Sequence, residues 1–270
     1  MSKNSITDSI ADSISIADYA PAKNALQDKV ILITGAGDGF GRSLALNFAN
    51  HGATIILLGK TKKKLEKVYD EIEQQGNPQA AIMPMDLGKA VESDYQQLAT
   101  AIQDNFGQLD GMVLNAVTLG QHSPVVNIDI DQWTSSLHIN LTANFLLLKH
   151  CSGLLNKAGR SSVIYVSDQL AVHGKAYWGT YAISKSACIN LMQTVADEWE
   201  SNTEIHVNSI DPGPMGTGMR RQAFPGEDPS LQPAPETAAN TLLYFMDPGH
   251  SWPNGKHFTW EPAAQKLTKN

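Results

Sequence analysis

The stretch Thr34-Gly35-Ala36-Gly37-Asp38-Gly39-Phe40-Gly41 decides the fold that the sequence predicts. It follows the run Val30-Ile31-Leu32-Ile33, which is typical of a strand buried on both faces, and it precedes a helical pattern. A turn between such a strand and a helix favours residues without a Cβ atom, because the backbone must bend sharply and approach a phosphate closely. The first amides of the helix then favour a pyrophosphate. The stretch therefore predicts a dinucleotide-binding turn whose cofactor-binding residues are Gly35, Gly37, Asp38, Gly39, Phe40 and Gly41.

Strand and helix patterns alternate from Val30 to Ile210. Further strands are expected near 54–58, 80–85, 112–115, 163–166 and 205–210, and helices near 62–75, 95–105, 131–151 and 178–200. Strands that are separated by helix-length segments imply right-handed crossovers and a parallel sheet. Because proline cannot donate a hydrogen bond to a neighbouring strand, Pro84 predicts that its strand lies at a sheet edge. We expect one doubly wound, Rossmann-type α/β domain over residues 29–270, with about seven parallel strands and helices on both faces.

Two segments differ from this pattern. Residues 1–28 form an extension in which Ile6, Ile10 and Ile14 recur every four residues. That spacing fits one face of a helix docked on another subunit, but we favour a flexible polar tail. Residues 214–235 are rich in proline and glycine, and a long irregular segment in a compact domain is typically a substrate lid.

Composition excludes several classes of protein. The net charge of −7 argues against binding to nucleic acid or to anionic lipid. No apolar run approaches the roughly 20 residues that cross a bilayer. Cys151 and Cys188 lie far apart, without the spacing of a metal site, so we expect no metal and a reducing, cytoplasmic location.

Several further motifs follow the glycine turn in a recognisable order. They are Asp86, Asn115-Ala116, Asn140, Tyr181-x-x-x-Lys185, Pro212-Gly213 and Thr217. In this order, and with the spacing Gly-x-x-x-Gly-x-Gly in the turn, the chain resembles the short-chain dehydrogenase/reductase family from Val30 to Trp260. The combination of Leu-Leu-Gly-Lys with Ala-Phe-Pro-Gly-Glu-Asp-Pro resembles a bacterial branch of that family without a clear substrate assignment.

Tyr181 and Lys185 are the candidate catalytic pair. They lie one helical turn apart, so both can face the same site. Tyrosine has a pKa of about 10, and a nearby ammonium group lowers it, which lets the phenol exchange a proton with a substrate. The resemblance implies that Lys185 also holds the nicotinamide ribose and that a water on the Asn140 backbone links Lys185 to a proton relay.

Asp168 departs from the family pattern. The family usually has a serine thirteen positions before the tyrosine, where it donates a hydrogen bond to the substrate oxygen. An ionised Asp168 cannot donate, and its charge opposes a tyrosinate at Tyr181. Three alternatives stay open: Ser167 replaces the serine after a local bulge, Asp168 itself serves a substrate with an amine or hydroxyl group, or the site binds cofactor and turns over poorly.

The end of the second strand bears on which dinucleotide binds. An acidic residue there would repel a 2′-phosphate, but the chain has Lys60 and Thr61, so NADP(H) is favoured over NAD(H). Asp38 is discordant, since members of the family that prefer NADP often carry a basic residue there. The resemblance extends the cofactor-binding set, with Val117 replacing the usual glycine, to Asp86, Leu87, Asn115, Ala116, Val117, Tyr181, Lys185, Pro212, Gly213 and Thr217.

These observations predict an NADP(H)-dependent oxidoreductase that reduces a small carbonyl compound or oxidises the corresponding alcohol. The alternative is a catalytically weak dinucleotide-binding sensor or scaffold, which Asp168 favours and which Tyr181, Lys185 and Asn140 oppose. The resemblance also implies a homodimer or homotetramer built on the long helices near 131–151 and 178–200.

Overall fold

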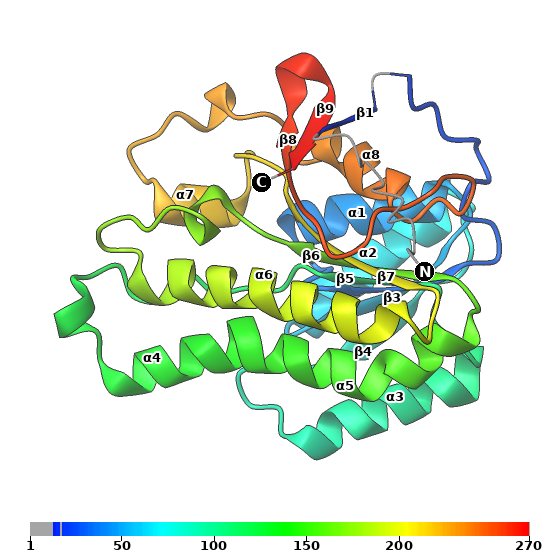
Figure 1. The fold of residues 1–270 in the computed structure, drawn as a ribbon, viewed down its shortest axis with the longest axis horizontal. Helices are drawn as coiled ribbons and strands as arrows, with labels where there is room; N and C mark the ends of the chain where they lie inside the picture. The colour runs from blue at the N-terminus through cyan, green and yellow to red at the C-terminus, as the bar shows by residue number, and fades with distance from the viewer. Residues whose placement is uncertain (1–12, 17, 270) are drawn as a thin grey trace, which may run out of the picture.

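The computed structural model describes residues 13–16 and 18–269, and this part of the chain folds around one sheet (Figure 1). The strand order is β1-β9-β8-β7-β6-β5-β2-β3-β4. Seven strands are parallel, as predicted, and they are β4 (Ala81–Pro84), β3 (Thr54–Gly59), β2 (Val30–Thr34), β5 (Gly111–Leu114), β6 (Ser161–Val166), β7 (Ile205–Asp211) and β8 (His257–Glu261). Two antiparallel strands, β9 (Lys266–Lys269) and β1 (Ser13–Ser15), extend one edge, so the sheet has nine strands rather than about seven.

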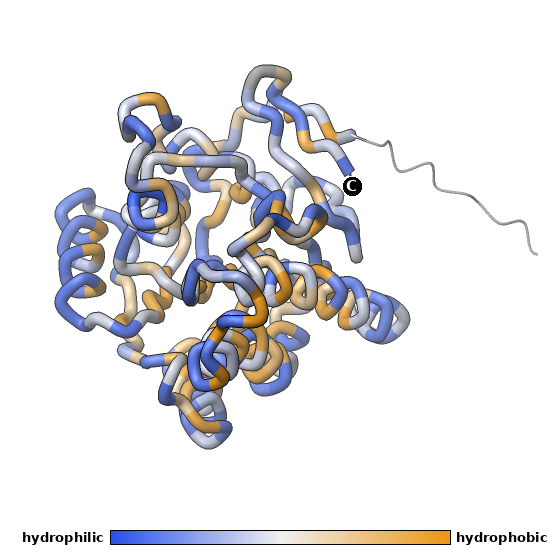
Figure 2. Tube along the Cα trace, turned by 90° about the vertical axis from the view of Figure 1, so that its left-hand side faces the viewer, coloured by the Kyte–Doolittle hydropathy of each residue, from blue (hydrophilic) through white to orange (hydrophobic). Residues whose placement is uncertain are grey.

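Helices cover both faces of the sheet, which confirms the doubly wound α/β class. One face carries α1 (Gly39–Asn50), α2 (Lys62–Gln74) and α8 (Glu236–Tyr244), and the other carries α3 (Glu92–Phe106), α5 (Ala143–Lys157) and α6 (Gly179–Glu200) (Figure 1). Figure 2 shows hydrophilic stretches on the outer turns of these helices and hydrophobic ones toward the sheet. The strands are apolar on both faces because each face packs against a helical layer.

The edge position predicted for the strand with Pro84 is confirmed. Strand β4 pairs with β3 alone and ends the sheet on that side. Pro84 has no N–H group to donate, and at the edge of the sheet β4 has no second neighbouring strand that would accept such a hydrogen bond.

The helix expected near 131–151 is interrupted. It begins as α4 (Ile130–Leu137), passes through a π-helical turn at His138–Thr142, and continues as α5. Such a turn adds a residue to the helix and changes the direction of nearby side chains and carbonyls, and it is frequent at functional sites. Asn140 lies in this turn.

The extension at the start of the chain is not helical where the structure describes it. Ile14 lies in β1, opposite Leu267 of β9, and Leu26 is fully buried. The alternative of a helical face, which we did not favour, does not hold at Ile14, because pairing with an open sheet edge satisfies the backbone better than an isolated short helix. Ile6 and Ile10 lie outside the described residues.

The segment predicted to be a lid is mostly irregular. It contains the short helix α7 (Gly218–Ala223) and a 3₁₀ turn at Pro229–Leu231. It follows β7 and lies at the carboxyl end of the sheet. The strand order reverses between β2 and β5. In open α/β sheets, ligands bind at this switch point.

Candidate active site

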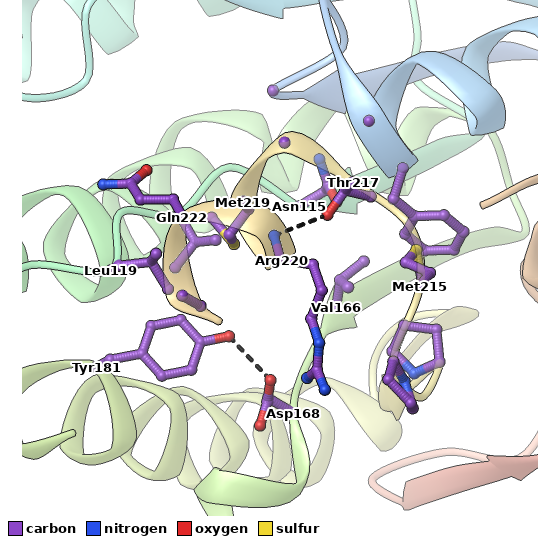
Figure 3. Close-up of a pocket in the computed structure, with 18 of the residues that line it drawn as sticks. Asn115, Leu119, Val166, Asp168, Tyr181, Met215, Thr217, Met219, Arg220 and Gln222 are labelled. Atoms are coloured by element: carbon purple, nitrogen blue, oxygen red, sulfur yellow. Dashed lines mark hydrogen bonds between the residues drawn. The ribbon is translucent and has the colours of Figure 1, made fainter. Parts of the chain in front are cut away.

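One cavity of about 550 Å³ opens at the carboxyl ends of the strands (Figure 3). Its lining comes from the glycine turn, the ends of β5, β6 and β7, helix α6 and the segment around α7. It brings together fourteen of the predicted site residues, which are Gly35, Asp38, Gly39, Phe40, Asn115, Ala116, Val117, Ser167, Asp168, Tyr181, Lys185, Pro212, Gly213 and Thr217.

The glycine turn is built by close backbone approach. Gly35 and Gly39 have φ angles of +68° and +49°, which favour glycine. A Cβ atom on Gly41 would lie 2.3 Å from the Gly35 carbonyl oxygen, so Gly41 is needed although it does not line the cavity. Gly37 also lies outside the lining, and a Cβ atom there would lie 2.9 Å from the Cβ of Lys64.

The geometry of Asp38 explains the residue that was discordant in the sequence. Its carboxylate accepts a hydrogen bond from the Gly39 amide at 2.7 Å, and so caps α1. Lys64 Nζ donates to its other oxygen at 2.6 Å, and this bond is the largest of the effects that lower the pKa of Asp38. Because Lys64 balances the charge of Asp38, the cofactor end of the cavity does not present an unpaired carboxylate.

Thr34 connects the glycine turn to the end of β5. Its hydroxyl oxygen accepts hydrogen bonds from the amides of Asn115 and Ala116, both at 2.9 Å. Asn115 Nδ2 in turn donates to the Thr34 carbonyl at 3.0 Å. These bonds fix the two strand ends between which the dinucleotide-binding crevice lies.

The residues predicted to read the 2′-phosphate lie beside the cavity rather than in its lining. Lys60 Nζ is 3.2 Å from Asp86 Oδ2, and its side chain is 72% exposed. Thr61 is the residue before α2, and its side chain makes no capping bond to that helix. Asp86 and the buried Leu87 also lie outside the lining. The Lys60 ammonium and the Thr61 hydroxyl are thus exposed groups directly after the end of β3.

Lys185 is buried beside the candidate tyrosine. Its Nζ donates to the Val166 carbonyl at 2.6 Å and lies 4.9 Å from the centre of the Tyr165 ring. Burial lowers the pKa of Lys185 to about 8, against smaller opposing effects of Asp168 and other groups. It forms no ion pair with a carboxylate among the residues that the structure describes.

Asp168 contacts Tyr181 directly. Tyr181 Oη donates to Asp168 Oδ2 at 3.1 Å (Figure 3). The Leu170 amide donates to Asp168 Oδ1 at 2.8 Å. Burial, followed by the charge of Asp168 and this hydrogen bond, raises the pKa of Tyr181 well above its ordinary value. The raised pKa of Tyr181 agrees with the expectation that the charge of Asp168 opposes a tyrosinate.

Ser167 continues the strand and does not replace Asp168. Strands β6 and β7 stay in register from Ser161 to Val166, and the Ser167 amide donates to the Ile210 carbonyl at 2.7 Å, without a bulge. Its hydroxyl is buried at the cavity and has no hydrogen-bond partner in the described structure.

Asn140 is held away from the cavity by its own contacts. Its side chain bonds both the amide and the carbonyl of Thr118, at 2.8 and 2.9 Å, and reaches Ser184 Oγ at 3.0 Å. Its carbonyl oxygen accepts from Asn144 Nδ2 at 2.7 Å and from Cys188 Sγ at 3.1 Å. Both lone pairs of that oxygen are therefore engaged by side chains.

Three residues that the sequence analysis did not select act on this site. Asp211 is buried at the end of β7, and burial raises its pKa to about 6. Lys64 binds Asp38, and Arg220 lines the cavity near Asp168. The only sequence signal for Asp211 is its place directly before Pro212-Gly213, at the end of an apolar strand.

The residues present fit a nicotinamide dinucleotide. The glycine turn leaves the backbone open at the start of α1, where amides lack intrahelical partners. The unpartnered Ser167 hydroxyl adds a buried polar atom at the cavity that a bound group could satisfy. The described residues contain no group of three or more His, Cys, Asp or Glu side chains placed to hold a metal ion. No helix in the same part of the chain is long and apolar enough to cross a membrane.

The model of the short chain dehydrogenase family matches residues 29–228. The chain belongs to this family. A curated relative, "Uncharacterized oxidoreductase YciK" of Escherichia coli K12, is 36% identical over 92% of this chain and 97% of its own length. The expected membership of a branch without an assigned substrate is therefore confirmed, and the chain is an oxidoreductase of the short-chain dehydrogenase type.

Solved structures agree with this assignment. A short-chain dehydrogenase from Salmonella enterica serovar Typhi superposes with a TM-score of 0.86 at 36% identity, covering 89% of this chain and 99% of that one. A chain from Escherichia coli CFT073, solved in complex with NADPH, gives a TM-score of 0.85 at 36% identity and covers 88% of this chain and 99% of its own.

Proposed function

We propose that this short-chain dehydrogenase is an NADP(H)-dependent oxidoreductase that reduces a small carbonyl compound or, in reverse, oxidises the alcohol. The observation that carries the proposal is the shared cavity: Tyr181 and Lys185 face the same space as the glycine turn. A phenol and a buried ammonium beside a dinucleotide crevice suit proton exchange coupled to hydride transfer.

The preference for NADP(H) rests on charge at the ends of β3 and β4. Lys60 is an exposed cation there, and Thr61 offers a hydroxyl without a capping bond. Asp86 is paired with Lys60 and Asp38 with Lys64, so neither carboxylate is left unpaired toward a 2′-phosphate. The relative solved with NADPH supports the same cofactor.

The cofactor, when bound, supplies or accepts the hydride. The chain's own residues do the rest: the glycine turn holds the pyrophosphate, Thr217 and Gly213 border the nicotinamide, and Lys185 holds the ribose. Tyr181 exchanges the proton with the substrate oxygen, and Asp168 sets the state of that proton through its bond to Tyr181 Oη.

NADPH binding followed by a turnover panel tests the proposal. Calorimetry with NADPH and NADH is expected to show tighter binding of NADPH, and consumption of NADPH is then followed with small ketones, aldehydes and quinones. Turnover by the wild type supports the proposal. NADPH binding without turnover of any carbonyl or imine compound favours the sensor or scaffold, and absence of NADPH binding contradicts the proposed function.

We also propose a cytoplasmic homo-oligomer. Phe145 on α5 and Ile183 on α6 are large apolar side chains that are 47% and 44% exposed, and they lie on the two long helices for which the resemblance implies an interface. The two buried free cysteines suit a reducing compartment. Light scattering of the wild type and of Phe145→Glu tests the assembly, since a dimer or tetramer on this face is expected to dissociate.

A further inference from the structure

The charge beside the reacting position is negative and lacks an ion-pair partner. Asp168 accepts from the Leu170 amide and from Tyr181 Oη, and it forms no ion pair among the described residues. When hydride adds to a ketone, negative charge develops on the oxygen. At this site that oxygen would meet a carboxylate in place of a hydroxyl donor, and the carboxylate opposes such charge.

The other charges around the cavity do not reverse this sign. Lys185 is a cation, but a second carboxylate, Asp211, is buried at the end of the neighbouring strand and acts on the same groups. Arg220 faces Asp168 from α7, but its Nε and Nη2 atoms bind both oxygens of Glu227, at 2.6 and 2.7 Å. Counting these five groups as ionised leaves one excess negative charge.

The route by which the enzyme would replace a spent proton is also altered. The family resemblance implies that a water bound to the Asn140 carbonyl continues the proton relay from Lys185. Here that carbonyl accepts from Asn144 and from the thiol of Cys188, and Lys185 donates to the Val166 carbonyl. The thiol and the amide thus occupy both acceptor positions that the relay water needs.

Part of the cavity wall beside Tyr181 is aromatic and apolar. Trp178 packs on Tyr181 and on Phe224, with ring centres 5.6 and 5.4 Å apart, and Leu119 and Met219 complete this surface. Such a surface suits apolar groups, and the face of Phe224 is already covered by the Arg220 guanidinium, 3.8 Å from the ring centre. The cavity therefore combines an acceptor carboxylate with a surface that suits the hydrocarbon part of a substrate.

We infer that the preferred substrate class is a protonated imine, whose N–H⁺ group donates to Asp168, rather than a ketone. The inference rests on the proposed NADP(H)-dependent function and names the substrate of that same site. Hydride from NADPH forms the new C–H bond at the iminium carbon, and the π electrons of the C=N bond move to nitrogen. The imine becomes a neutral amine and NADPH becomes NADP⁺. No proton from Tyr181 is needed, since the substrate brings its own.

A matched pair of substrates tests the inference on the full chain with NADPH. Methylpyrroline is a cyclic imine with the C=N bond inside its five-membered ring, and methylcyclopentanone is a five-membered-ring ketone of similar size with its oxygen outside the ring. The wild type is expected to show a kcat/KM at least about tenfold higher for the imine, the scale of one charge-assisted hydrogen bond. Asp168→Asn is expected to lose most of this preference, and Asp168→Ser is expected to reverse it. The control Asp70→Asn, an exposed aspartate on α2, is expected to change neither rate.

Binding of the product-like amine gives a readout that does not depend on turnover. Calorimetry in the presence of NADP⁺ is expected to show that methylpyrrolidine binds the wild type at least about tenfold more tightly than Asp168→Asn. Methylcyclopentanol, a neutral alcohol of similar size, is expected to bind both proteins equally. Circular dichroism of each variant confirms that it is folded.

The outcomes separate this inference from the function on which it rests. Failure to bind NADPH overturns both. A wild type that reduces the ketone at least as well as the imine overturns the inference and leaves the proposed function standing. Amine affinity that is absent, or unchanged in Asp168→Asn, overturns the inference even where neither ring compound is turned over.

Discussion

The glycine turn and the ends of β6 and β7 line the same cavity, but they follow the family pattern to different degrees. The turn keeps its glycines and the Thr34–Asn115 connection, and its one discordant residue, Asp38, caps α1 and is paired with Lys64. Across the cavity, a carboxylate replaces a hydroxyl at Asp168, Asp211 adds a second acid, and Cys188 binds the Asn140 carbonyl. This contrast is the basis of our proposal that the family's cofactor chemistry is retained while the handling of the substrate proton is changed.

Tyr181→Phe is expected to have the largest effect, and it is expected to change turnover at the substrate end of the cavity without changing cofactor binding at the glycine turn. Because the phenol is the only proton donor proposed for a carbonyl oxygen, ketone or aldehyde turnover is expected to fall about a thousandfold, within the range for general acid catalysis. NADPH affinity is expected to change less than about twofold, since the hydroxyl bonds Asp168 and not the glycine turn. Steady-state rates and calorimetry measure both. Retained carbonyl turnover would remove Tyr181 from this role.

Gly41→Ala tests the cofactor end alone. Its Cβ atom would lie 2.3 Å from the Gly35 carbonyl oxygen, so the turn must distort and NADPH affinity is expected to fall about a hundredfold or more. Gly153→Ala is the matched control, because nothing lies within 4 Å of its Cβ position on α5, and it is expected to leave affinity unchanged. Affinity within a factor of about three of wild type in Gly41→Ala would contradict this account of the turn.

Asp211→Asn measures how much the buried, ionised Asp211 carboxylate lowers the free energy of unfolding. The folded-state pKa of Asp211, about 6, is above its ordinary value of 3.8, so the folded protein holds this proton more tightly than the unfolded chain. The stabilisation is complete below the ordinary pKa and is lost as pH rises through about 6. Asp211→Asn is therefore expected to raise the free energy of unfolding by about 3 kcal/mol at alkaline pH and to have little effect in acid. Denaturant unfolding across pH checks it, and a pH-independent difference would be inconsistent with titration of Asp211.

Lys60→Ala gives the smallest effect and sharpens the choice of cofactor. Loss of one exposed phosphate contact is expected to weaken NADPH about tenfold and to leave NADH unchanged. Lys63→Ala, an exposed neighbour, is the control. If NADPH and NADH lost affinity equally, Lys60 would act on both cofactors through its general charge and would not recognise the 2′-phosphate.

Local signals were sufficient to locate six of the seven parallel strands, β2 to β7, but not β8. The apolar run before Gly35, the glycine turn and Pro84 each act through the backbone within a few residues, and each determines a strand, a turn or an edge. Strand β1 was missed because three residues of alternating pattern gain stability only from pairing with β9, at the other end of the chain. The π-helical turn at Asn140 has no counterpart in the apolar periodicity.

The site was predictable where a motif names its residues and not where tertiary packing creates the chemistry. Tyr181 and Lys185 could be selected from their spacing behind the glycine turn, and Asp168 from the family resemblance, which places a serine thirteen positions before the tyrosine. The pairing of Lys64 with Asp38, the thiol of Cys188 on the Asn140 carbonyl and the burial of Asp211 depend on contacts between distant elements. A sequence shows these residues, but only the folded chain shows that they act on one another.

The central claim is that the cofactor end is conventional and that Asp168 limits carbonyl chemistry at the other end. The most direct measurement compares NADPH consumption by wild type and Asp168→Ser with the same ketones, alongside the NADPH dissociation constant of each. The account predicts that Asp168→Ser reduces ketones at least about tenfold faster with an unchanged dissociation constant. Ketone reduction that is equal or slower in a folded, NADPH-binding Asp168→Ser protein would contradict it.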